Sequence, residues 1–163
     1  MPVNNSNITL QDFAAIVPAF KNFKDPVNIK GLISGRLSSL RFQKMELKYG
    51  KSVIFNADLD LSGLPNIEET FVYAQINELK ADKSDIQDVV SNLTKKPFVL
   101  PKELNQLGTV SYKGNITGFF SNLVAYGNLN TNLGSVSTDV LLKFENMLKD
   151  LTYNGTVKSS SIS

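Results

Sequence analysis

Pairs of acidic side chains are the feature of this sequence closest to a catalytic pattern. Asp58 and Asp60 lie two residues apart, and Glu68 and Glu69 are adjacent. Glycoside hydrolases use two such carboxylates as general acid and as base or nucleophile. Asp58 and Asp60, however, fall on the polar side of an alternating strand, where charged side chains are ordinarily solvated. We therefore interpret both pairs as surface charge.

A further acidic group, formed by Asp82, Asp85 and Asp88, surrounds the expected start of a helix. The helix dipole favours negative charge there. Calcium is the alternative, but the glycine and terminal glutamate of an EF-hand loop are missing. The chain also has no histidine, cysteine or tryptophan, which excludes His-dependent triads, thiolate nucleophiles and zinc-finger spacing. The sequence thus predicts no catalytic site, no metal and no cofactor, and we expect a protein that is not an enzyme.

Composition and charge favour a folded chain without a nucleic-acid partner. Hydrophobic residues make up 42% of the 163 residues and charged residues 20%, which is unlike a disordered tail or a membrane span. The 17 basic and 15 acidic side chains are interspersed, whereas binding to nucleic acid needs a concentrated basic surface. The start at Met1 and the serine-rich end lead us to expect a piece of a longer protein, whose signal or anchor lies elsewhere.

Hydrophobic alternation with a period of two predicts a mainly β chain. We expect strands at 27–37, 40–49, 52–64, 71–79, 110–120, 123–133, 135–144 and 151–158. Two or three short α-helices are expected between them, at 9–17, at 85–93 and as one turn near 101–108. Thr9 with Asp12, and Ser84 with Gln87, resemble capping boxes at the first two of these helices.

The sequence contains an internal duplication. A shift of 83 residues places 27–40 over 110–123 with seven of fourteen positions identical, including both glycines of each segment. Gly31, Gly35, Gly114 and Gly118 are interpreted as bends or close backbone approaches within strands. The predicted organisation is a helical lead-in (1–25), a first β-repeat (26–83), a connector with a helix and prolines (84–108) and a second β-repeat (109–163). Repeats of this kind are expected to stack and share one core.

These features together resemble the TamB branch of the AsmA-like family, in the versions found in Bacteroidetes-type bacteria. The resemblance rests on the segments 29–40 and 60–69 in the first half, and on 100–104, 112–119, 126–131 and 153–156 in the second. It implies antiparallel β-repeats curled into an open trough, or a stacked sheet, within a periplasmic protein anchored in the inner membrane. The implied partners are phospholipid acyl chains, neighbouring repeats of the same chain and an outer-membrane assembly component.

The resemblance therefore suggests a non-enzymatic segment that shields lipid acyl chains during phospholipid transport or outer-membrane assembly. The expected lipid-binding side is one set of apolar positions: Val27, Ile29, Ile33, Val53, Phe55, Leu59, Leu61, Val110, Tyr112, Ile116, Leu129, Val136, Val140 and Leu142. A plain closed core would produce the same alternation. Two other functions remain open, a secreted or cell-surface β-rich module for binding or adhesion, and a purely structural spacer.

Overall fold

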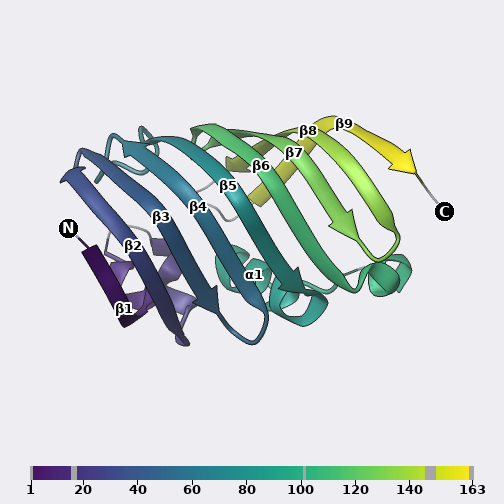
Figure 1. The fold of residues 1–163 in the computed structure, drawn as a ribbon, viewed down its shortest axis with the longest axis horizontal. Helices are drawn as coiled ribbons and strands as arrows, with labels where there is room; N and C mark the ends of the chain where they lie inside the picture. Colours follow the sequence, from purple (N-terminus) through teal and green to yellow (C-terminus); the bar gives the residue numbers. More distant parts are fainter. Residues whose placement is uncertain (1, 16–17, 101, 146–149, 162–163) are drawn as a thin grey trace.

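The computed structural model of the chain describes residues 2–15, 18–100, 102–145 and 150–161. Within them the dominant feature is one open, antiparallel sheet of nine strands (Figure 1). The strands are β1 (Pro2–Thr9), β2 (Pro26–Arg36), β3 (Ser39–Tyr49), β4 (Val53–Ser62), β5 (Phe71–Asp82), β6 (Thr109–Phe119), β7 (Asn122–Thr131), β8 (Gly134–Glu145) and β9 (Asp150–Ser161). Every strand pairs with the next one in the sequence. The predicted mainly β class is confirmed.

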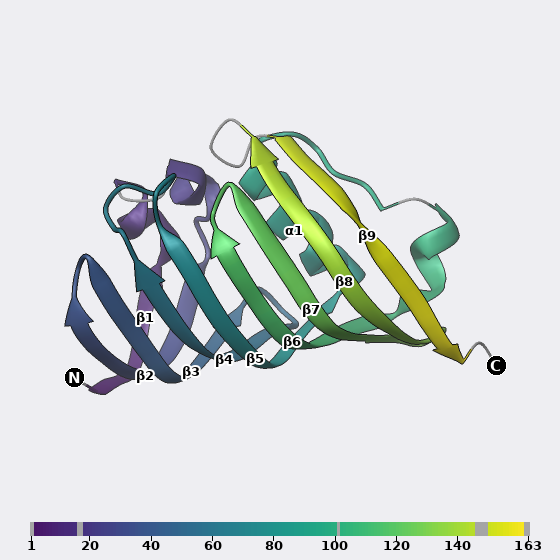
Figure 2. The same ribbon diagram turned by 90° about the horizontal axis from the view of Figure 1, so that it is seen from above.

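The sheet does not break between the two predicted repeats. Although a long connector separates β5 from β6, the two strands pair directly from Phe71 opposite Phe119 to Asp82 opposite Thr109. Both halves of the chain therefore belong to one continuous sheet, which is seen from two directions in Figures 1 and 2. The division of the chain into repeats and connector stays a prediction.

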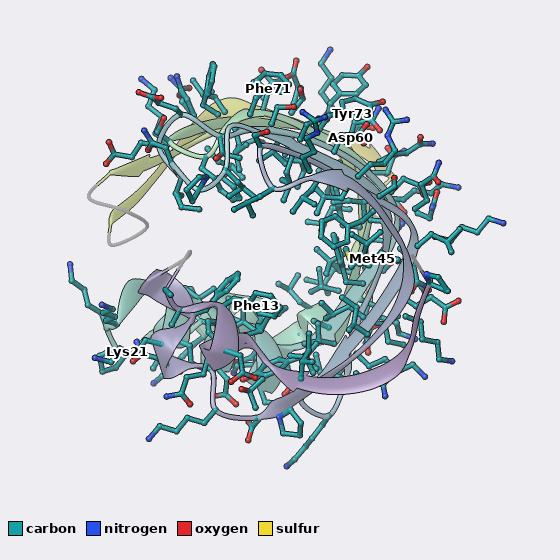
Figure 3. The ribbon with its side chains drawn as sticks, turned by 90° about the vertical axis from the view of Figure 1, so that its left-hand side faces the viewer. Phe13, Lys21, Met45, Asp60, Phe71 and Tyr73 are labelled. Carbon is teal, nitrogen blue, oxygen red and sulfur yellow. The ribbon has the colours of Figure 1, made fainter. Side chains whose placement is uncertain are left out.

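The strands are strongly bent along their length, so the sheet curves around the axis on which the strands stack (Figures 1 and 3). Viewed end-on, it follows an arc, and the helical segments lie opposite the inner side of that arc (Figure 3). Met45 points toward the inner side, whereas Phe71 and Tyr73 lie on the outside. Met45 is accordingly buried, while Phe71 and Tyr73 are exposed.

The helical elements differ from the expectation in kind. Among the described residues only α1 (Lys83–Thr94) is an α-helix. The others are 3-10 helices, η1 (Leu10–Phe13), η2 (Pro18–Asn22) and η3 (Lys102–Leu107). The prediction of two or three α-helices was therefore wrong. Proline fixes φ at a helical value but offers no N–H, so Pro18 begins η2 instead of ending a longer helix.

The lead-in and one helix start also need correction. Residues 2–9 form β1 at the edge of the sheet, so the segment 1–25 is not wholly helical. The capping box of Thr9 and Asp12 is present. The one predicted at Ser84 is not, because α1 begins at Lys83 with Asp82 as its N-cap residue. Gln87 instead accepts a hydrogen bond from the backbone N–H of Leu100 at 2.9 Å.

Two glycines of the duplicated segment have the predicted role of close backbone approach. Gly35 and Gly118 have φ of +100° and +130°, values that side chains with a Cβ rarely adopt. A Cβ at either position would collide with a backbone carbonyl of the next strand, that of Ser39 or Asn122. Each glycine thus permits the tight hairpin that follows it, β2 to β3 in one case and β6 to β7 in the other.

Two hydrophobic clusters line the inner side of the sheet. The larger one has buried Ala57, Val72, Ala74, Ile76 and Leu123 at its base, with bigger, half-buried side chains around them. The smaller one is where η1, η2 and α1 pack onto the sheet, and it contains Phe23, Val27 and Tyr49 together with Leu10, Phe20, Leu47, Val53 and Val89. The helical segments therefore cover the sheet near the ends of β2 to β4.

Candidate functional site

The candidate site is the inner face of the sheet, defined here by five rows of residues that lie opposite one another in β2 to β8. Directly opposed residues of antiparallel strands project to the same face. The pairing gives these rows: Leu40, Leu61, Val72, Gly118, Leu123, Leu142; Ile33, Phe42, Leu59, Ala74, Ile116, Ala125, Val140; Met45, Ala57, Ile76, Gly114, Gly127, Thr138; Ile29, Leu47, Phe55, Leu79, Tyr112, Leu129, Val136; and Tyr49, Val53, with Ala81, Val110.

All fourteen residues of the predicted set lie on this inner face. Thirteen of them occur in the pairings above, and Val27 packs with Tyr49 in the smaller cluster. Val27 is fully buried at 0% exposure, and the other thirteen are half-buried. The sheet therefore brings residues from both halves of the chain onto one surface, and large apolar side chains on it keep some contact with solvent.

The inner face contains no charged residue in the described part of β2 to β8. The outer face is different, since its rows include Arg41, Asp60, Lys48 and Lys80. An acidic or basic side chain on the inner face would lose hydration and have no partner there. The inner face is thus suited to apolar molecules and unsuited to charged ones.

Sequence reasoning missed several residues of this face. Leu40, Phe42, Leu47 and Leu79 occupy the same rows as the predicted set. Two-residue alternation did mark their strands, but bulges in β3 and β5 shift the phase of the alternation within each strand. Phe13 was also missed as part of this region. It faces the inner side of the arc from η1 (Figure 3) and is 41% exposed.

Two glycines covered by a tyrosine lie at the middle of the inner face. Gly114 and Gly127 are directly opposed in β6 and β7, and the Tyr112 hydroxyl lies 2.9 Å from the Cβ position of each. The tyrosine side chain therefore crosses over both glycines. Burial raises the pKa of Tyr112, and a hydrogen bond with Thr138 opposes that rise only in part. The phenol is consequently neutral across the physiological range.

One margin of the inner face is held by Asp85 of α1. Its carboxylate accepts hydrogen bonds from the backbone N–H groups of Ser52 (2.6 Å) and Lys51 (3.1 Å) and from the Ser52 hydroxyl (2.6 Å). Burial opposes ionisation of this group, but the hydrogen bonds from Ser52 and Lys51 outweigh it and lower the pKa of Asp85. Asp85 is thus a structural link between α1 and the hairpin of β3 and β4.

Two other acidic residues singled out by spacing, Asp58 and Asp60, are also engaged in the fold. Asp60 pairs with Arg41 at 2.7 Å on the outer face. Asp58 accepts a hydrogen bond at 2.8 Å from the backbone N–H of Lys44, which has a φ of +50° in the bulge of β3. No group of three or more potential metal ligands occurs among the described residues. Nor does this part of the chain contain a helix with the length and apolar character needed to span a bilayer.

Comparison with known proteins returned no match, whether to a protein-family model, to a curated protein or to a solved structure. Inference about function therefore starts from the geometry of the inner face.

Proposed function

We propose that this chain binds lipid acyl chains along the inner face of its curved sheet, which acts as an open apolar trough. The observation that supports this most directly is that one uncharged surface continues across the strands while its side chains are incompletely buried. Uncharged rows run across seven strands, yet most of their large side chains are half-buried instead of sealed. A closed core of similar size would bury most of them fully.

The helical segments that pack on the sheet also support an open trough, because they cover only part of its inner face. The smaller cluster places η1, η2 and α1 over β2 to β4 near one margin. The larger cluster, spanning β4 to β8, consists of residues from the sheet itself and the adjoining Phe120. Its apolar surface can therefore be covered by a bound molecule, and each methylene removed from water there contributes about 0.8 kcal/mol.

The length of the face fits an acyl chain. Neighbouring strands are about 4.8 Å apart, so β2 to β8 span about 29 Å across the strands. The hydrocarbon core of a bilayer, which two opposed acyl chains fill, is about 30 Å thick. One acyl chain lying across the strands would therefore extend over about half of this length. Contacts of this kind have no directional preference, so a lipid could move along the face without being held at one position.

The biological setting is proposed on the resemblance described above. In a TamB-like protein the chain would be a non-enzymatic segment in the periplasm, and its trough would continue into neighbouring repeats. It would contribute to phospholipid transport or to outer-membrane assembly, with an outer-membrane assembly component as a further partner.

The test is native mass spectrometry of the purified chain, together with organic extraction and lipid analysis. We expect co-purified phospholipid or fatty acid. Phe55→Asp places a charge in the middle of the inner face and should abolish lipid binding. Ile54→Asp is the matched control, because Ile54 is adjacent in the same strand but lies in an outer row opposite Lys48 and Lys80.

Circular dichroism of both variants distinguishes loss of binding from loss of folding. Should Phe55→Asp unfold the chain, Leu129→Gln provides a milder change in the same row of the inner face. The proposal is wrong if the folded wild-type chain carries no lipid and takes none up from phosphatidylglycerol vesicles. It is also wrong if Ile54→Asp removes lipid as completely as a folded inner-face variant does.

A further inference from the structure

A second surface with binding character lies on the outside of the sheet. A hollow of about 360 Å³ is lined by residues of β7, β8 and β9. Six of them belong to outer rows, namely Tyr126, Asn128, Ser137, Asp139, Thr156 and Lys158, and Gly127 and Thr138 lie between them in their strands. The size of the hollow falls at the lower end of the range of about 300–1,000 Å³ that small-ligand sites occupy. The hollow is separated from the inner face by the thickness of the sheet.

The strand pairing orders these side chains into two short rows. Tyr126, Asp139 and Thr156 are opposed across β7, β8 and β9 in one row, and Asn128, Ser137 and Lys158 form the next. Opposed Cβ atoms are about 5 Å apart. An aromatic ring is therefore flanked, within one or two side-chain spacings, by a carboxylate, an amide, two hydroxyls and an ammonium group.

Tyr126 has the exposure expected of a binding platform. Its side chain is 65% exposed, which is more than for any other aromatic residue among the exposed large hydrophobics. Beside it, the Ser137 hydroxyl donates a hydrogen bond to Asn128 Oδ1 at 3.0 Å. That bond fixes the Asn128 amide and leaves its Nδ2 group to donate to a ligand. The ring offers a flat apolar surface, and the surrounding groups offer directed hydrogen bonds.

A second exposed ring lies on the same face at some distance. Tyr73 is 42% exposed and is opposed through Thr117 to Val124, which is two residues from Tyr126 in β7. The two tyrosines are two strands and two residues apart, which places their Cα atoms about 12 Å apart. Figure 3 shows Tyr73 on the outside of the arc. Polar Asn115 and Gln75 lie in the row of Tyr126, so the rings are separated by hydrogen-bonding groups.

We propose that this outer surface binds a neutral oligosaccharide, with Tyr126 stacking against one sugar ring. Asp139 and Asn128 would hydrogen-bond to hydroxyls of that sugar, and Tyr73 would contact a sugar further along the chain. A protein partner would require a continuous apolar patch at the centre of its interface, whereas polar Gln75 and Asn115 lie between Tyr73 and Tyr126. A strongly charged ligand is disfavoured because Asp139 and Lys158 contribute opposite charges to the same hollow.

This inference is independent of lipid binding, because the two surfaces lie on opposite faces of the sheet. The experiment is saturation-transfer NMR of the complete chain with maltohexaose, cellohexaose and mannohexaose, followed by calorimetric titration of the sugar that binds. Tyr126→Ala should weaken binding about tenfold or more, as expected for loss of an aromatic stacking contact. Tyr126→Phe keeps the ring and should retain most of the affinity.

Leu133→Ala is the matched control, since Leu133 is an exposed apolar residue in the turn between β7 and β8, outside the hollow. It should leave the affinity unchanged, whereas Asp139→Asn should weaken binding without affecting the thermal midpoint. The proposal is overturned if none of the three sugars gives a transfer signal at millimolar concentration. It is equally overturned if a sugar binds but Tyr126→Ala and Leu133→Ala have the same affinity.

Discussion

Replacement of Asp85 by alanine tests whether α1 is held to the sheet by the contacts described above. The variant removes a carboxylate that accepts three hydrogen bonds, two of them from backbone N–H groups of Lys51 and Ser52. The helix would keep its sequence-encoded propensity, since alanine is the best helix former. A loss of stability would therefore come from the missing hydrogen bonds and, by a smaller amount, from the lost negative charge in the first turn of the helix.

The magnitude follows from the donors left behind. A buried donor that loses its acceptor costs about 1–3 kcal/mol. Because the Ser52 hydroxyl can turn toward other partners, we count the two backbone N–H groups, which gives about 2–4 kcal/mol after allowing for water at the turn. For a chain of this size that corresponds to a lowering of the thermal midpoint by about 5–15 °C.

Urea unfolding followed by circular dichroism measures this change, with Asp88→Ala as the control. Asp88 lies in the same helix but is exposed, so its replacement should alter the free energy of unfolding by less than about 0.5 kcal/mol. Equal effects of the two substitutions would refute the assignment of Asp85 as the link between α1 and the β3–β4 hairpin.

The pH dependence provides a second measurement on the same pair of proteins. Since folding lowers the pKa of Asp85, its ionised form stabilises the folded chain at neutral pH, above the ordinary carboxyl pKa of about 4. The stabilisation is lost as the pH falls through the lower pKa of the folded state. The stability difference between wild type and Asp85→Ala should therefore be constant from pH 7 to pH 5 and narrow below about pH 4. A difference that grows on acidification would contradict this sign.

Three further substitutions test other parts of the fold. Gly118→Val should destabilise the chain by more than about 2 kcal/mol in thermal unfolding, because its Cβ would meet the carbonyl of Asn122 at a φ of +130°; an unchanged midpoint would exclude that contact. Phe23→Ala should cost about 3–5 kcal/mol in urea unfolding, because the ring is only 3% exposed at the junction of η2 and the sheet. Arg41→Gln should lower the free energy of unfolding by less than about 1 kcal/mol, since the two partners of its ion pair with Asp60 are 60% and 42% exposed. A larger loss would contradict the view that this exposed ion pair contributes little to stability.

The sequence was sufficient to predict eight of the nine strands, β2 to β9, because the periodic signal is strong there. Val53, Phe55, Ala57, Leu59 and Leu61 alternate without interruption, and their strand was predicted within two residues at each end. The same alternation assigned all fourteen residues of the predicted set to one side of their strands. Because each strand pairs directly with the next one in the sequence, those sides then lie on a common face.

Other features could not be read from periodicity. β1 contains Pro2 and a run of asparagine and serine, so it lacks alternation and is defined only by its pairing with β2. The start of α1 was misassigned because Ser84 and Gln87 fit a local capping pattern, whereas the actual position depends on tertiary partners. Asp82 donates its backbone N–H to Ser52, thirty residues earlier in the chain. Sequence spacing does not contain that contact.

The curvature and openness of the sheet were likewise beyond local patterns. Period-two alternation is the same for a sandwich, a barrel and a curved open sheet. Bulges in β3 and β5 bend these strands, and the bulge in β3 depends on a single residue, Lys44, adopting a positive φ. The hollow beside Tyr126 was also missed, because outward polar residues give no signal that distinguishes a binding surface from ordinary solvated surface.

The strictly sequential order of the strands has a consequence for how such a protein can change in evolution. Because each strand pairs only with its neighbours in the chain, the insertion of a hairpin between two strands interrupts a single existing pairing and leaves all others intact. The sheet can therefore gain or lose length by small duplications without rethreading, and its folding can spread from one hairpin to the next at low loop-closure cost. The length of the sheet along the axis on which the strands stack is thus a property that selection can adjust in steps of two strands.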